Sequence, residues 1–238
     1  MRKKIEDIRI AEPHTNIINK RVLGMGHVIT QLFYRYIGDY YMEDVNIIGI
    51  YITVSEYDKN YHILPTDDSH SYNLKHLYTY INEKYLLSLN DYDKMKLVGE
   101  LIYKSLIDLA VYNSLPLEPI DEAYKKIIET DYFYEPQKKY KSKNKKYTCW
   151  LEYRKEYTIC TYRLGFMNND GEIKRFLVRA KEYSNYDNYD KTDYIKFLLL
   201  PRELKVTGWI SSIEFEMYWG EEEKYIFNAE KEEVKRVL

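Results

Sequence analysis

A nearly continuous β-branched run, DVNIIGIYITVS from Asp44 to Ser55, constrains the fold more than any other part of the chain. β-Branched side chains are stiff at χ1 and fit the pleated surface of a sheet. Polar and apolar residues do not alternate through Ile47–Ile52, so the run predicts a central strand that is buried on both faces. The chain has 238 residues, of which 45% are hydrophobic, and this is enough apolar material to form a core around such a strand.

Helices are predicted on both sides of this strand in the first half of the chain. Apolar residues recur at intervals of three and four in Val22–Ile37, Leu74–Tyr85 and Met95–Leu109, which is the spacing of one helix face. Only a short break at Asn90-Asp91 separates the last two segments, so we expect an antiparallel helical hairpin. A short edge strand over residues 4–10 and a short helix over Asp121–Thr130 complete this half.

The polar, basic segment EPQKKYKSKNKK, Glu135–Lys146, has no apolar periodicity and marks the expected domain boundary. We therefore predict an α+β domain over residues 1–135, a basic linker over 136–146 and a mostly antiparallel β domain over 147–238. In this last part, 147–153, 157–167 and 172–181 have the pattern of strands. Asn168-Asn169-Asp170-Gly171 favours a hairpin turn, because Asn, Asp and Gly tolerate positive φ.

The clearest alternation of the second half runs from Trp209 to Trp219. One face carries mainly apolar residues and the other carries Glu214 and Glu216, which predicts one half-buried antiparallel strand. A last strand is expected over Lys224–Asn228 and a charged helix over Ala229–Leu238. The predicted fold class is α+β, with an N-terminal strand and helix part containing a helical hairpin, and a C-terminal antiparallel β meander.

Bulk composition argues against several function classes. The formal net charge is −2 and the pI is near 6.3, whereas proteins that bind nucleic acid or membrane surfaces over their whole surface are usually more basic. No stretch approaches the length of a membrane span, and Glu6-Asp7 stands where a signal peptide needs an apolar run. Cys149 and Cys160 are expected to stay reduced. These features predict a soluble cytoplasmic protein of bacterial origin.

Glycine and histidine patterns give no assembled phosphate or metal motif. Gly24-Met25-Gly26-His27 lacks both the third glycine of a dinucleotide fingerprint and the Lys-Ser/Thr pair of a P-loop, so it is interpreted as the turn that starts a helix. The densest set of metal-ligand types is His62, Asp67, Asp68 and His70, but Asp and Ser are also common turn residues. The sequence predicts no metal and no cofactor.

Carboxylates offer one further arrangement for chemistry. Glu214 and Glu216 lie two apart on one predicted strand and share a face, and Glu152 and Glu156 could join them. Paired carboxylates about 5–10 Å apart would suit glycoside hydrolysis. Alternation alone explains the pair as the solvated side of a strand, so no catalytic residue is assigned.

Tyrosine is the most unusual residue type, with 28 Tyr against 7 Phe. AT-rich coding sequence favours Tyr, Lys, Ile and Asn together and explains much of this bias. The alternative is a binding face, because tyrosine combines a large ring, a hydroxyl and little conformational entropy. The acidic, Tyr-rich segment 183–193 is the clearest candidate. Its partner-binding residues would be Tyr183, Tyr186, Asp187, Tyr189 and Asp190.

The leading hypothesis is a non-catalytic intracellular protein that binds a protein partner, and its acidic, Tyr-rich segment would suit a basic one. Such a chain is similar in type to bacterial immunity proteins that block a cognate toxin: small, acidic to neutral, Tyr-rich and α+β. The resemblance rests on no motif residue, so it transfers no functional position. Two alternatives stay open. One is a non-specific nucleic-acid-associated protein that uses Lys138–Lys146, and the other is an enzyme with a site assembled between the two halves.

Overall fold

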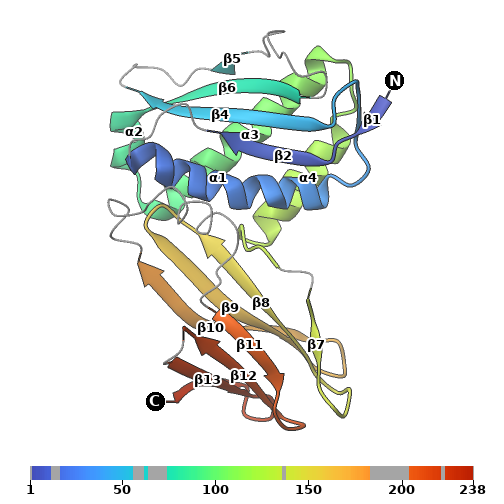
Figure 1. The fold of residues 1–238 in the computed structure, drawn as a ribbon, viewed down its shortest axis with the longest axis vertical. Helices are drawn as coiled ribbons and strands as arrows, with labels where there is room; N and C mark the ends of the chain where they lie inside the picture. The colour runs from blue at the N-terminus through green and yellow to red at the C-terminus, as the bar shows by residue number, and fades with distance from the viewer. Residues whose placement is uncertain are drawn as a thin grey trace. The chain divides into compact units, whose positions relative to one another are not determined.

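The chain forms two compact units in a computed structural model that describes residues 2–11, 17–55, 62–63, 74–135, 138–182, 204–220 and 223–237. The first, here called the α/β unit, runs from Met1 to Tyr132 and also includes Lys155–Thr158. The second, the β unit, comprises Phe133–Arg154 and Ile159–Leu238. The expected α+β class is confirmed, with the long helices in the first unit and antiparallel sheets in the second (Figure 1).

The α/β unit is built on a four-stranded sheet in the order β2-β4-β6-β5. Strands β2, β4 and β6 are parallel, and β5 is antiparallel to β6. A small second sheet pairs β1 with β3. The strands are β1 (Arg2–Lys4), β2 (Asp7–Ala11), β3 (Tyr41–Glu43), β4 (Ile47–Ser55), β5 (His62–Ile63) and β6 (Leu74–Asn82). The helices are α1 (Ile17–Tyr36), α2 (Glu83–Ser88), α3 (Asp91–Tyr112) and α4 (Glu118–Glu129).

The predicted central position is confirmed for β4, which lies between β2 and β6 (Figure 1). The expected burial of both faces is wrong, because Ile47, Tyr51 and Ser55 share one face of the strand and are half exposed. On the opposite face Ile48, Ile50, Ile52 and Val54 are almost completely buried. Parallel register places Leu77 of β6 beside Ile50 on the same face. Helix α1 packs on β4 and helix α3 packs on β6. Burying each large apolar side chain contributes about 1.5–3 kcal/mol.

Glycine allows α1 to approach the sheet closely. A Cβ on Gly26 would lie 2.0 Å from Cδ1 of Ile10 on β2 and 3.5 Å from a methyl group of Val98 on α3. The sequence interpretation of Gly24–His27 as a turn at the start of a helix is therefore wrong. These residues lie in the middle of α1, where the missing side chain makes room for the neighbouring elements.

The predicted helix over Leu74–Tyr85 is also wrong, and with it the predicted helical hairpin. Residues Leu74–Asn82 form β6. Along this strand Leu77, Thr79 and Ile81 are buried while their neighbours are half exposed, which is a period of two. The apolar residues of this segment fit the period of a helix as well as that of a strand. It forms a strand because it pairs with β4 in parallel along nine residue pairs.

The segment Lys155–Thr158 is held by charged side chains of the α/β unit. The Tyr157 ring is buried beneath Arg21 and Lys94, whose cationic groups lie 5.1 and 4.4 Å from the ring centroid. Both the backbone N–H and the hydroxyl of Thr158 donate to Asp91 at the start of α3. This tyrosine therefore serves as a packing group with cations on its ring.

The β unit contains two four-stranded sheets, in the orders β10-β9-β8-β7 and β11-β12-β13-β14. Rings from the two sheets form a shared core, in which Phe227 lies 5.0 Å from both Phe166 and Phe176. The strands of the first sheet are β7 (Tyr140–Lys141), β8 (Thr148–Lys155), β9 (Ile159–Met167) and β10 (Ile173–Glu182). Those of the second are β11 (Leu204–Trp209), β12 (Glu214–Trp219), β13 (Glu223–Asn228) and β14 (Glu233–Val237).

Two predictions for the C-terminal part need correction. The Trp209–Trp219 alternation is not one strand, because residues 210–213 turn back and the Ser211 hydroxyl accepts N–H bonds from Ile213 and Glu214. The predicted helix over 229–238 is instead a turn followed by β14, which pairs antiparallel with β13. Asn228 accepts N–H bonds from the next turn, and the charged residues that resembled a solvated helix lie on an edge strand.

The expected hairpin turn at Asn168–Gly171 is confirmed: it joins β9 to β10, and Gly171 has a φ of +82°. Residues 138–146, expected as part of a basic linker, include β7 and a turn that leads to β8. No helix among the described residues has the length and apolar character needed to cross a membrane.

Replacing Gly165 by alanine is expected to destabilise the β unit. The new Cβ would lie 2.2 Å from Cε2 of the buried Trp150, whose indole N–H is fixed by a 2.9 Å bond to Glu152. Overpacking of this kind costs about 1–3 kcal/mol of unfolding free energy, measured by urea denaturation. Leu177→Ala, at a side chain that is 64% exposed, is the control and should change it by less than about 0.5 kcal/mol. Equal effects of both variants would contradict the packing.

Acid should weaken the α/β unit through His27. Burial, with a contribution from Lys155, lowers the pKa of this imidazole below its ordinary 6.5. As the pH falls, the unfolded chain therefore takes up the proton before the folded chain does. The contribution of neutral His27 to the free energy of unfolding is thus fully present above pH 6.5 and is lost as the pH falls towards the folded-state pKa. Urea denaturation at pH 7.5 and 5.0 should show a smaller acid loss in His27→Gln than in the wild-type chain. An unchanged difference would show that His27 does not contribute.

Candidate functional site: a tyrosine-lined pocket

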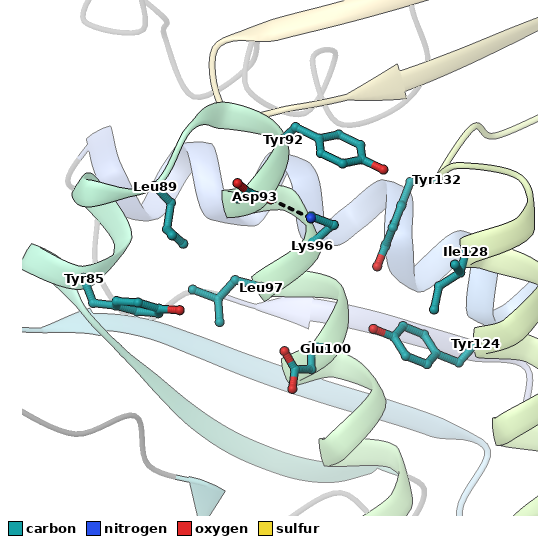
Figure 2. Close-up of a pocket in the computed structure, with 10 residues that line it drawn as sticks. All are labelled: Tyr85, Leu89, Tyr92, Asp93, Lys96, Leu97, Glu100, Tyr124, Ile128 and Tyr132. Atoms are coloured by element: carbon teal, nitrogen blue, oxygen red, sulfur yellow. Dashed lines mark ion pairs between the residues drawn. The ribbon is translucent and has the colours of Figure 1, made fainter.

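An open pocket of about 410 Å³ lies on the α/β unit, where α2, the first half of α3 and the end of α4 meet (Figure 2). Four tyrosines, three aliphatic residues and three charged residues form its walls. They are Tyr85, Leu89, Tyr92, Asp93, Lys96, Leu97, Glu100, Tyr124, Ile128 and Tyr132. All ten lie within 48 residues of sequence, so the pocket belongs to one continuous part of the chain.

Two asparagine caps set the wall formed by α2 and α3. The side chain of Asn82 accepts the N–H of Tyr85 at 2.9 Å, and that of Asn90 accepts the N–H of Asp93 at 2.8 Å. These caps start two helices in close succession, so Tyr85 projects from the first turn of α2. Asn90, in the break noted at Asn90-Asp91, is the N-cap of α3.

Helix α3 divides its two faces between the core and the pocket. Residues 93, 96, 97 and 100 follow the i, i+3, i+4, i+7 spacing of one face and line the pocket. Val98 and Ile102, on another face, are completely buried. The polar face of this helix is therefore the floor of a concave site.

The end of α4 supplies the opposite wall through an unusual backbone. Asp131 and Tyr132 both have positive φ, +54° and +58°, a conformation that side chains other than glycine rarely adopt. The Asp131 carboxylate accepts the Tyr92 hydroxyl at 2.6 Å, which ties this turn to α3. The Tyr132 ring then lies on Gly99, where a Cβ would be 2.7 Å from Cε1 of the ring. Local strain of this kind is sustained only by surrounding contacts.

Aromatic stacking holds Tyr124 in the pocket wall. Its ring is stacked on Tyr103 at 4.3 Å and on Phe33 at 5.9 Å between centroids. Tyr103 in turn donates its hydroxyl to Asp121 at 2.7 Å, a hydrogen bond that raises the pKa of Tyr103 to about 12. Two stacked rings thus hold Tyr124, and its hydroxyl end extends towards Glu100 (Figure 2).

The pocket combines neutral hydroxyls with exposed charges. Burial, together with a hydrogen bond to Tyr124, raises the pKa of Tyr132, so its hydroxyl stays protonated at neutral pH. Asp93 is paired with Lys96 at 2.6 Å, which lowers the pKa of Asp93, and the Lys96 ammonium lies 5.0 Å from the Tyr92 ring centroid. Glu100 forms an exposed pair with Lys104 at 2.6 Å. Rings, hydroxyls and carboxylates together suit a ligand with both apolar and donor character.

The sequence analysis did not identify this pocket. Its expected partner-binding residues, Tyr183, Tyr186, Asp187, Tyr189 and Asp190, lie outside the described residues, so that prediction stays untested. The pocket tyrosines are spread over 85–132 and form no local motif. Helical spacing of Asp93, Lys96 and Glu100 was the one available signal, but a polar face usually indicates solvent exposure.

Other candidate sites from the sequence are occupied by structural contacts or lie outside the described part. Of the predicted metal-ligand set, His62 lies in β5, and Asp67, Asp68 and His70 lie outside the described residues. No group of three or more His, Cys, Asp or Glu side chains that could hold a metal occurs in the described ranges. Cys149 and Cys160 are buried and not disulfide-bonded, and burial raises the pKa of the Cys149 thiol.

Two of the four carboxylates considered for paired chemistry, Glu152 and Glu216, are paired with cations. Glu152 is buried, accepts the Trp150 indole N–H and forms ion pairs with Arg163 and Arg175. Glu216 was expected on a solvated strand face, but it is only 6% exposed. Its hydrogen bond with Lys224 lowers the Glu216 pKa. These charges stabilise the β unit in the arrangement seen here.

Comparison of the chain with protein-family models, with curated proteins and with solved structures found no match.

Proposed function

We propose that this chain is a non-catalytic protein that binds a protein partner, of the kind that neutralises a toxin in the bacterial cytoplasm. The tyrosine-lined pocket of the α/β unit is the observation that carries the proposal. Aromatic residues are enriched in the binding cores of protein interfaces, and tyrosine dominates many evolved paratopes. A cytoplasmic setting agrees with two cysteines that are not disulfide-bonded.

The pocket has the construction of a preorganised contact surface. Tyr124 is fixed by stacking, Tyr132 by its contact with Gly99 and Tyr92 by its bond to Asp131. Rigid side chains lose little conformational entropy when a partner arrives, so more of the contact energy appears as affinity. Tyr85, at 48% exposure, remains available for new contact.

Tyr85→Ala should weaken partner capture at least tenfold, because truncating a central aromatic anchor commonly costs 2 kcal/mol or more, on the order of a 30-fold loss. The measurement uses the full-length chain as bait in extract from its native host. A stoichiometric partner is then identified by mass spectrometry and its dissociation constant is measured with purified protein.

Tyr112→Ala is the matched control, since Tyr112 is 54% exposed on the same unit but does not line the pocket. It should leave the dissociation constant within about twofold. Failure to recover any stoichiometric partner, or equal effects of the two variants, would count against the proposal.

A second candidate function rests on the lysines between β7 and β8. Lys141, Lys143, Lys145 and Lys146 are exposed, and the structure shows no ion pair for them within the described ranges. The Ser142 hydroxyl accepts the Tyr147 N–H at 3.0 Å and closes the turn that presents them. A closed turn with several unneutralised ammonium groups favours contact with phosphates of a nucleic acid, without sequence preference.

Replacing these four lysines by glutamine would test this candidate by fluorescence anisotropy with labelled single- and double-stranded oligonucleotides at 50 mM salt. If the turn binds phosphates, the variant should lose at least tenfold in affinity and show a weaker salt dependence. Lys125→Gln, an exposed lysine of α4, is the control. Absent binding, or binding that the fourfold variant retains, would dismiss the candidate.

A further inference from the structure

We infer that the tyrosine-lined pocket receives an arginine side chain of the protein partner, with the Glu100 carboxylate as its anionic contact. The inference rests on the proposed function and specifies the group that the pocket recognises. It is argued below from the charge of the lining, from the rings and from the geometry of the acceptors.

The charge of the lining favours a cation. Two carboxylates, Asp93 and Glu100, stand against a single ammonium, Lys96. Asp93 is paired with Lys96 inside the lining at 2.6 Å, whereas Glu100 is paired with Lys104, which does not line the pocket. A cationic ligand can replace Lys104 at Glu100, whereas an anionic ligand would find the ammonium of Lys96 already paired with Asp93.

The rings favour a cation as well. The ammonium of Lys96 lies 5.0 Å from the Tyr92 ring centroid, so one pocket tyrosine already holds a cation on its face. The Tyr85 ring lies on the other side of the pocket and is 48% exposed (Figure 2). A planar guanidinium stacks on such a ring, and a compact, strongly hydrated ammonium does so less well.

The hydrogen-bond acceptors of the pocket suit a ligand that carries several N–H donors better than a ligand that carries one. In Figure 2 the Tyr124 and Tyr132 hydroxyls and the Glu100 carboxylate face the same part of the pocket. Tyr124 and Tyr132 share one hydrogen bond, and each hydroxyl oxygen keeps capacity to accept another. Guanidinium carries five N–H donors in a fixed fork, which suits a carboxylate flanked by two hydroxyl oxygens.

Glu100 must exchange one partner for another when the arginine binds. Its present partner is Lys104, one turn further along α3, and the two side chains are 49% and 56% exposed. Exposed pairs at this spacing contribute little to stability, so breaking the Glu100–Lys104 pair costs little free energy. Removing Lys104 should therefore strengthen binding, an effect opposite to that of removing Glu100.

The test uses N-acetyl-arginine amide as the probe and its neutral isostere, N-acetyl-citrulline amide, as the comparison. Binding to the full-length chain is followed by NMR shifts of ¹³C-labelled tyrosine rings, assigned with Tyr85→Phe and Tyr124→Phe. Arginine amide should shift the pocket tyrosines saturably, and citrulline amide should bind at least tenfold more weakly. Glu100→Gln should weaken arginine binding about tenfold, and Lys104→Met should strengthen it about two- to fivefold.

Glu122→Gln is the matched control, an exposed carboxylate on α4 outside the lining, and it should leave arginine binding unchanged. Equal binding of citrulline amide or of N-acetyl-lysine amide would overturn the inference, as would an unchanged affinity in Glu100→Gln. If Tyr85→Ala abolishes capture of the native partner while Glu100→Gln does not affect it, the proposed function stands and the arginine assignment fails. If both variants lose capture of the native partner, the result supports an arginine in the partner's contact surface.

Discussion

Burial of one face of β4 is the interaction on which the α/β unit depends. Ile48, Ile50, Ile52 and Val54 are at most 6% exposed, and α1 packs on this strand while α3 packs on the neighbouring β6. Burial contributes about 1.5–3 kcal/mol for each of these side chains, which is one part of what offsets the entropy lost when the helices are ordered. The pocket follows from it, because α3 is fixed by its apolar face and its charged face becomes one wall.

The pocket shows how tyrosine hydroxyls are used in this chain. Three of the four pocket tyrosines have a second contact that fixes the ring: a bond to Asp131 for Tyr92, stacking for Tyr124 and the Gly99 surface for Tyr132. A phenylalanine could pack in these places, but it could not offer a donor and acceptor at the pocket surface. Codon composition explains many tyrosines at once, whereas the pocket gives these particular ones a physical role.

The β unit differs from the α/β unit because it buries charged side chains within its sheets. Glu152 is buried among Trp150, Arg163 and Arg175, so all of its acceptor positions face donors. A buried carboxylate with these hydrogen-bond and ion-pair partners is tolerated, although removing one partner would leave a costly unpaired charge. The Arg163 guanidinium also lies 3.4 Å from the Phe133 ring centroid, which extends the network into the aromatic part of the unit. Charge and packing are thus coupled in this sheet.

The sequence by itself determined the central strand, the α+β class and the Asn168–Gly171 turn, because these depend on local propensity and on which side chains must leave water. It could not decide between strand and helix for residues 74–82, where apolar residues fit both periods and only pairing with β4 selects one. The break at 210–213 inside a clean alternation, and the strand at 233–237, likewise depend on partner strands. The pocket was decided by the tertiary structure alone. Helical spacing places 93, 96 and 100 on one face, but only the packing of α2 and α4 beside α3 makes that face concave and brings four distant tyrosines around it.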